Sequence, residues 1–436
     1  MCTVDGVVQF ASGRPRHHTE DWQSGVALSS ACLTLEAMRV VSVAAPLLVA
    51  CTVTACLPGA EALPFAPAGV DAAPDPARLG PYPVGVRTVS LIDSFRVDDE
   101  GKPRTLPLEV WYPAAESARD QAGETIRLYD ALPPDLQADL TADDLGAIPT
   151  SAVRDAEARR DNVRFPLVVF SHGKGGIRIQ SNFYTVALAS HGYVVIAPDH
   201  VGDTVVQLLR EVKNEGTIQV DSTVEAIVYR PEDVMAILDL YDSVIGDDVA
   251  AIVDSEHVGV TGHSFGALTS FLVASRDYRV DAVVAQTPTS QEVIDLQSQT
   301  PMAELEKPAL LQSATLDDTL PEDTNARPLY ETLRNHKAWL SLARAGHFTY
   351  SDLCVLDVQA ISAAVNLDVS NVLDDGCGPG ALETERAFPM INATAIGFFN
   401  QQLRGSSGSA AFLTQATIDA IAPGEGTFVQ TGLAPE

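Results

Sequence analysis

Basic residues are scarce in this chain relative to acidic ones. It has 28 Lys plus Arg against 58 Asp plus Glu, which gives a formal net charge of −30. A field of that sign repels nucleic acid and anionic membrane surfaces, so we expect no nucleic-acid partner. Solubility or life in a salty medium is the preferred explanation of the charge.

Cysteine is scarce after the first sixty residues, where only Cys354 and Cys377 remain. The chain has no Cys-x-x-Cys and no ligand spacing typical of a zinc site. The acidic clusters at 317–323 and 374–375 are interpreted as solvated loops rather than as a structural cation site. We therefore expect no metal and no cofactor. In an exported protein the two cysteines would form a disulfide, and two separate buried thiols are the alternative.

Long apolar runs are also few, and the clearest one lies near the start. Arg39 is followed by apolar residues from Val40 to Ala50 and then by Cys51, the pattern of an export signal. The run barely reaches the length of a membrane span. Its end resembles a bacterial lipoprotein cleavage box, and cleavage after Ala62 is the alternative. We interpret residues 1–62 as an upstream extension plus this signal, and predict an exported protein that is periplasmic, secreted or lipid-anchored at the cell envelope.

The remainder predicts one catalytic domain over residues 83–404, after a Pro/Ala linker at 63–82 and before a low-order tail at 405–436. Residues 84–91 and 105–112 alternate like an opening hairpin, and the acidic stretch 113–162 is expected to form helical insertions that roof the site. From Phe165 onward, short apolar runs alternate with amphipathic stretches, which describes a mostly parallel sheet buried between helices. The predicted strands are 165–170, 193–197, 257–261, 280–285, 309–312 and 338–342.

Ser264 is the candidate nucleophile, in the sequence Gly262-His263-Ser264-Phe265-Gly266. The pentapeptide follows a predicted strand and opens a predicted helix, as a nucleophile elbow requires. Glycines two residues before and after the serine allow strand and helix to approach closely. A serine hydroxyl needs a base and an oxyanion hole, so the chain must supply both.

Acid and base should follow the nucleophile in that order. Of the two histidines after Ser264, His347 lies in a short loop after a strand, whereas His336 lies at an exposed helix end. His347 is therefore the predicted base. Asp317 or Asp318, in the loop after the strand 309–312, would orient it, and Asp317 is preferred.

The oxyanion donors are predicted to be the backbone N–H groups of Phe265 and Lys174. Lys174 lies in a glycine-rich loop after the first parallel strand, where the main chain can turn its N–H groups toward a substrate. Phe348 and Tyr350 are candidate substrate-binding residues that could line an acyl pocket. The other histidines near these motifs are interpreted as packed or hydrogen-bonded neighbours.

Five motifs together resemble a known group of the α/β-hydrolase superfamily. They are 170–173, 188–193, 199–200, 262–266 and 345–348. The chain is similar over residues 80–404 to platelet-activating-factor acetylhydrolases and to exported dienelactone-hydrolase-like esterases. The resemblance implies an α/β-hydrolase fold and a calcium-independent ester hydrolase that acts through an acyl-enzyme.

The predicted position of the catalytic acid differs from that in the acetylhydrolases. In the animal acetylhydrolases it follows the strand after the nucleophile helix, but residues 285–288 here contain no carboxylate. An acid one strand later is similar to bacterial cutinases and polyester hydrolases. We expect hydrolysis of short acyl esters, such as acetyl or butyryl esters or platelet-activating-factor-like lipids. Hydrolysis of polyester, cutin or lipid at a surface is the alternative, and a non-catalytic exported binding lipoprotein is the contrasting class.

Overall fold

The computed structural model describes residues 74–98, 101–160, 163–215, 222–334, 336–366, 368 and 370–433. The predicted extension, export signal and both candidate cleavage sites lie outside these ranges, as does most of the linker. Within the described ranges, no helix has the length and apolar character needed to span a membrane.

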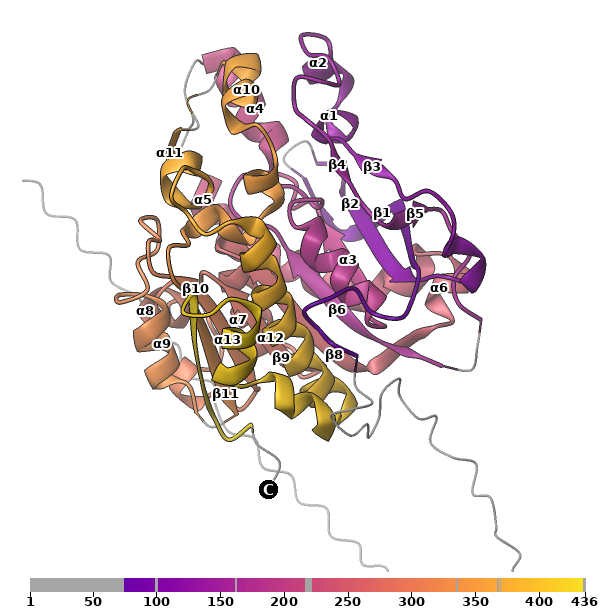
Figure 1. Ribbon diagram of the computed structural model, residues 1–436. Coiled ribbons are helices and arrows are strands. Elements are labelled where there is room, and N and C mark those ends of the chain that lie inside the picture. Colours follow the sequence, from indigo (N-terminus) through magenta and orange to yellow (C-terminus); the bar gives the residue numbers. More distant parts are fainter. Residues whose placement is uncertain are drawn as a thin grey trace, which may run out of the picture. The chain divides into compact units, whose positions relative to one another are not determined.

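A ten-stranded sheet forms the centre of the domain (Figure 1). The six strands from β7 to β11 along the sheet are parallel. β2 pairs antiparallel with β7 and with β1, β12 pairs antiparallel with β11, and the edge strand β5 pairs parallel with β1. In spatial order the strands are β12 (Gly426–Thr431), β11 (Lys337–Leu342), β10 (Ala309–Ala314), β9 (Val280–Gln286), β8 (Val253–His263), β6 (Phe165–Ser171), β7 (Val194–Pro198), β2 (Pro103–Pro113), β1 (Val84–Val97) and β5 (Ala152–Arg154). The predicted hairpin and all six predicted parallel strands are present.

Helices cover both faces because the central strands are apolar on both sides. One hydrophobic cluster joins the sheet to α5 (Ser222–Leu240), α7 (Phe265–Arg276), α8 (Gln291–Asp295) and α9 (Ala326–Thr332). A second joins the opposite face to α3 (Asn182–Ser190), α12 (Thr384–Arg404) and α13 (Gln415–Ile421), and α3 and α12 lie in front of the sheet in Figure 1. The other α-helices of the described residues are α1 (Leu128–Ala131), α2 (Pro134–Gln137), α4 (Val205–Glu215), α6 (Asp247–Ala250), α10 (Val358–Val365) and α11 (Ser370–Val372).

The C-terminal segment corrects the sequence prediction. Residues 405–436 were expected to form a low-order tail, but they include α13 and β12. β12 pairs with β11 along its whole length, from Lys337 opposite Thr431 to Leu342 opposite Gly426. Its side chains alternate between buried and exposed at the start of the strand, and Phe428 enters the core. The tail is thus an edge of the central sheet.

A smaller group of elements lies beyond the carboxyl ends of the parallel strands (Figure 1). It includes the short pair β3 (Thr125–Ile126) and β4 (Ile148–Pro149), the helices α1, α2, α4 and α10, and their connections. A separate hydrophobic cluster joins residues 128–145 to α4 and α10. We call these three segments the roof. The insertion 113–162 was predicted to take this place, but the contributions of α4 and α10 were not predicted.

Candidate active site

Ser264 lies at the turn between β8 and α7 with a backbone φ of 56° and ψ of −115°. A φ in this range is unfavourable for a residue with a side chain, and strain of this kind gathers at functional sites. The flanking glycines permit the turn: a Cβ atom at Gly266 would lie 1.8 Å from the carbonyl oxygen of Ser171, and one at Gly262 would lie 2.5 Å from the same atom. This is the local geometry that the pentapeptide predicted.

His347 and Asp317 come together as the sequence predicted. The imidazole Nδ1 of His347 lies 2.9 Å and 3.1 Å from the two carboxylate oxygens of Asp317, and both side chains are buried. The backbone N–H of Leu320 also donates to Asp317 at 2.6 Å, which fixes the carboxylate. The neighbouring Asp318 is exposed, so Asp317 is the residue that meets His347.

One cavity of about 490 Å³ contains these loops in its wall. Ser264 and His347 line it together with Lys174 from the glycine-rich loop and with Phe348. Its far walls are apolar and come from the roof and from residues of β3, β4 and 353–356 beside it. The lining residues there include Ile126, Leu128, Ile148, Leu208, Leu209, Leu353, Leu356, Val358, Ile361 and Val365.

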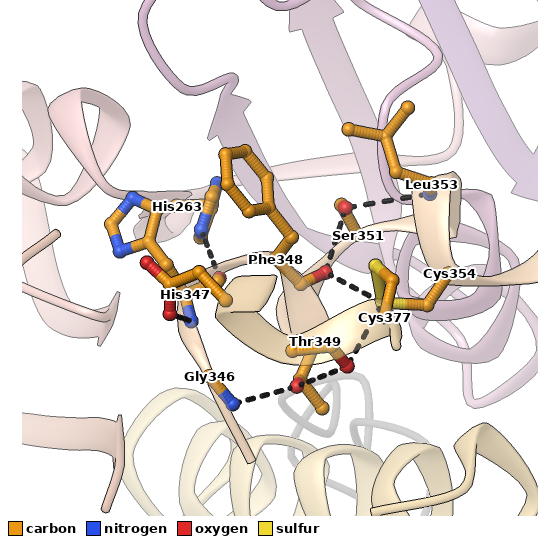
Figure 2. Close-up of a disulfide and its surroundings, with 11 residues drawn as sticks. His263, Gly346, His347, Phe348, Thr349, Ser351, Leu353, Cys354 and Cys377 are labelled. Atoms are coloured by element: carbon orange, nitrogen blue, oxygen red, sulfur yellow. Dashed lines mark hydrogen bonds between the residues drawn. A yellow bond between two sulfur atoms is a disulfide. The ribbon is translucent and has the colours of Figure 1, made fainter. Parts of the chain in front are cut away.

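The two predicted substrate-binding aromatics differ in position. Phe348 lines the cavity, and its ring meets the His347 imidazole edge to face at a centroid distance of 5.4 Å (Figure 2). Tyr350 does not reach the cavity, because it is fully buried and its hydroxyl donates to the carbonyl of Ser313 at 2.6 Å. The prediction for Tyr350 is therefore wrong: its ring belongs to the core beneath the site.

His263 holds the backbone of the candidate base, His347, through a hydrogen bond. Its Nδ1 accepts from the Gln180 amide at 3.1 Å, so its Nε2–H donates to the carbonyl oxygen of His347 at 2.9 Å (Figure 2). Burial, and next the nearby His347, hold the pKa of His263 well below its usual range, which keeps the ring neutral. Gln180 also accepts from the N–H of Gly173 at 2.9 Å. One amide side chain therefore connects the glycine-rich loop to the loop of the base.

Asp375 is a residue of the site that sequence reasoning missed. Its carboxylate accepts from the backbone N–H groups of His347 at 2.8 Å, Thr319 at 3.0 Å and Asp318 at 3.2 Å, and from the Thr319 hydroxyl at 2.7 Å. It is 4% exposed, so the interpretation of 374–375 as solvated loop fails for this residue. Its contacts span 28 and 57 positions along the chain, and no local pattern marks them.

A disulfide joins Cys354 and Cys377, as predicted, and lies beside the loop that carries His347 (Figure 2). Beside the disulfide, Thr349 connects the segment of His347 to the segment of Cys377. Its hydroxyl donates to the carbonyl of Gly376 at 3.3 Å and accepts from the N–H of Gly346 at 3.0 Å. The segment carrying Asp375 is thus fastened to the segment carrying His347 by covalent and hydrogen bonds.

The comparison with known proteins gives a consistent result. Residues 137–358 match a protein family described as PET hydrolase-like. The chain is 27% identical over 191 residues to Cutinase 2 of Thermobifida cellulosilytica, which covers 43% of this chain and 63% of that protein. It is also 27% identical over 158 residues to platelet-activating factor acetylhydrolase of Canis lupus familiaris, which covers 29% of this chain and 35% of the relative.

Among solved structures, a ferulic acid esterase from Streptomyces cinnamoneus superposes with a TM-score of 0.60 at 26% identity. The match covers 80% of this chain and 97% of that one. The matches to the cutinases span less than two thirds of those proteins' length. Together with the sheet topology, these findings confirm the predicted α/β-hydrolase fold.

Proposed function

The chain belongs to the PET hydrolase-like family, and we propose that it is a serine carboxylic ester hydrolase with the triad Ser264, His347 and Asp317. Two similarities support the proposal: the matched family is one of hydrolases, and the structural neighbour from Streptomyces cinnamoneus is a ferulic acid esterase. The observation that carries the proposal is the placing of a strained serine and an Asp-bound histidine in the wall of one cavity.

The proposed reaction follows from these positions. Nδ1 of His347 faces Asp317, so the N–H at this nitrogen donates to the carboxylate. The unprotonated Nε2 is then available to accept the hydroxyl proton of Ser264. The serine oxygen attacks the ester carbonyl, and the backbone N–H groups of Phe265 and Lys174 stabilise the resulting oxyanion. His347 then protonates the leaving alcohol, and water releases the acid from the acyl-enzyme by the same route. The mechanism requires no metal and no cofactor.

Substitution of the nucleophile tests this proposal. We expect Ser264→Ala to lower kcat for p-nitrophenyl butyrate by about 10⁴-fold or more. His347→Ala should lower it comparably, whereas His336→Ala should not, because the His336 side chain is exposed. Full turnover by Ser264→Ala would exclude the mechanism. Folded wild type that neither turns over esters nor labels with a fluorophosphonate would favour the non-catalytic binding lipoprotein.

The cavity extends the proposal to the substrate. The sequence predicts that the substrates are short acyl esters or platelet-activating-factor-like lipids. The apolar wall of the cavity further favours an ester of which one side is aliphatic. Leu356 and Ile361 lie on this wall, where an acyl chain longer than butyryl would remove apolar surface from water. Rates on p-nitrophenyl esters from acetyl to dodecanoyl measure the preference, and we expect Leu356→Trp to move the optimum toward shorter chains.

Polyester or cutin hydrolysis is the second candidate, because the matched family and the cutinase relatives point to it. A polymer chain must reach Ser264 past the roof formed by residues 128–145, α4 and α10. Product release from a polyester film at a rate comparable to that from a soluble ester would favour this candidate over the soluble aliphatic ester. Export, by lipid anchor or free release, also stays a proposal; loss of membrane fractionation in a Cys51→Ala variant would indicate the anchor.

A further inference from the structure

The side chain of Arg230 is fully buried beneath the glycine-rich loop. It projects from α5, and its guanidinium donates from Nη1 to the carbonyl of His172 at 2.6 Å and from Nη2 to the carbonyl of Gly173 at 3.0 Å. Two consecutive backbone carbonyls of the loop are therefore held by one rigid, planar group, which a lysine could not reproduce.

The bond to the Gly173 carbonyl helps to fix the direction of the Lys174 N–H. The Gly173 carbonyl and the Lys174 N–H belong to one planar peptide unit and point in opposite directions when the unit is trans. Every peptide bond among the described residues is trans. Because the Gly173 oxygen faces Arg230 in the interior, the Lys174 N–H faces the other way, and Lys174 lines the cavity.

His172 supplies a further side-chain donor to the same carbonyl, which also accepts from the backbone N–H of Gly176 at 3.1 Å. Its Nε2 accepts from the backbone N–H of His200 at 3.1 Å, which places the proton on Nδ1, and Nδ1 lies 2.7 Å from the Gly173 oxygen. Burial, and next the charge of Arg230, hold the pKa of His172 well below its usual range, so the ring stays neutral in this position.

The guanidinium also meets the second predicted donor. Its central carbon lies over the ring of Phe265, 4.7 Å from the centroid, and Phe265 is the first residue of α7. The ion partner of Arg230 is Asp203, with Nη2 2.9 Å from Oδ2, while Oδ1 of Asp203 accepts from the N–H of Gly175 at 3.1 Å. Arg230 and its partner thus contact both segments that would supply oxyanion donors.

We propose that Arg230 is a positioning residue for the oxyanion hole, which sets the direction of the Lys174 N–H through the Gly173 carbonyl and holds the start of α7 through the Phe265 ring. The inference rests on the proposed ester hydrolysis. Such a residue touches no substrate and acts on the transition state only through the donors that it aligns.

The test compares Arg230→Lys with wild type and with Arg404→Lys. Arg404 is a matched control because it is also buried and its guanidinium also donates to a backbone carbonyl, that of Gly192, and to the side chain of Asn400 at 2.6 Å, on α12 at the face of the sheet opposite to α5. For Arg230→Lys we expect kcat to fall about 10- to 100-fold with KM nearly unchanged, less than the roughly 10²–10³-fold typical for loss of a whole donor. Affinity for an alkyl boronic acid, which mimics the tetrahedral intermediate, should fall by a similar factor. Arg404→Lys should show neither change.

Other outcomes separate this inference from the proposed function. Wild type without ester turnover would refute the function itself. An active wild type with a folded Arg230→Lys variant of unchanged kcat, or with only a raised KM, would overturn the role of Arg230. If Arg230→Lys fails to fold, Asp203→Asn supplies the measurement, because it weakens the anchor of the guanidinium and of Gly175. Unchanged kcat and boronic acid affinity in that variant would also overturn the role.

Discussion

Replacing Asp375 by Asn removes the carboxylate that bridges the loop of the acid and the loop of the base. One carboxylate oxygen accepts from the N–H groups of His347 and Asp318, and the other accepts from the N–H and hydroxyl of Thr319. The Asn side chain has a single acceptor oxygen of the same shape. It can satisfy one of these pairs and must turn an NH₂ group toward the other.

The cost follows from two lost hydrogen bonds to a buried charged group. At about 1.5–3 kcal/mol each, Asp375→Asn should lower the free energy of unfolding by about 3–6 kcal/mol. A domain of ordinary stability, about 5–15 kcal/mol, survives this loss in most of that range. Because His347 and the Asp317 loop then relax independently, we expect kcat/KM to fall about 10- to 100-fold, as a displacement near 1 Å of a catalytic group would cause.

Urea unfolding and steady-state turnover of p-nitrophenyl butyrate measure the two effects. Asp374→Asn is the control, because Asp374 is the preceding residue with the same side chain but is exposed; it should change neither quantity. Equal stability of Asp375→Asn and Asp374→Asn would refute the reasoning altogether. A destabilised Asp375→Asn whose folded fraction keeps wild-type kcat/KM would show that the carboxylate stabilises the loops without positioning the base.

Two further predictions concern stability. Burial lowers the pKa of His191 from 6.5 to about 4, so the neutral ring stabilises the fold fully above pH 6.5, and this contribution, about 3 kcal/mol, is lost as the pH falls from 6.5 to 4. Urea unfolding of His191→Gln should show a correspondingly smaller loss between these pH values, and an unchanged pH dependence would contradict the assignment. Because the disulfide spans 23 positions, the double variant Cys354→Ser/Cys377→Ser should unfold about 3 kcal/mol more easily than oxidised wild type. If reductant releases both thiols of the wild type and its unfolding midpoint does not change, the predicted stabilisation by the disulfide is wrong.

The parallel sheet was predictable because each of its strands has a recognisable apolar sequence. Runs such as 165–170 and 282–285 are apolar on both faces, and their alternation with amphipathic stretches is typical of strands covered on both sides. The elbow was predictable for a similar reason, since Gly262 and Gly266 are required by close contacts within the turn at Ser264. The acid and base then followed from the order of strands, which places 317 and 347 at the same edge.

The missed parts depend on partners far away in the chain. β12 is a short edge strand after a stretch rich in Ser, Gly and Ala, and its pairing with β11 supplies the order that its composition does not predict. α10 has an apolar stripe formed by Val358, Ile361 and Val365, but the stripe alone does not say that its partners are α4 and residues 128–145, which lie far away in the chain. Tyr350 illustrates the converse error: an aromatic residue three positions from the base entered the core because its hydroxyl finds the Ser313 carbonyl.

The family match ends at residue 358, and the segment that follows contains two features of the site. α10 contributes to the roof, and Asp375 accepts from the N–H of His347. The disulfide between Cys354 and Cys377 closes a loop that begins seven residues after His347 and contains both features. The wall that would select the acyl chain and the carboxylate that would hold the base are therefore parts of one cross-linked loop. A change that loosens this loop acts on substrate choice and on base position together. A change in α4 acts on substrate choice and on the glycine-rich loop instead, because the N–H of Val205 in α4 donates to the carbonyl of Gly176 at 2.9 Å.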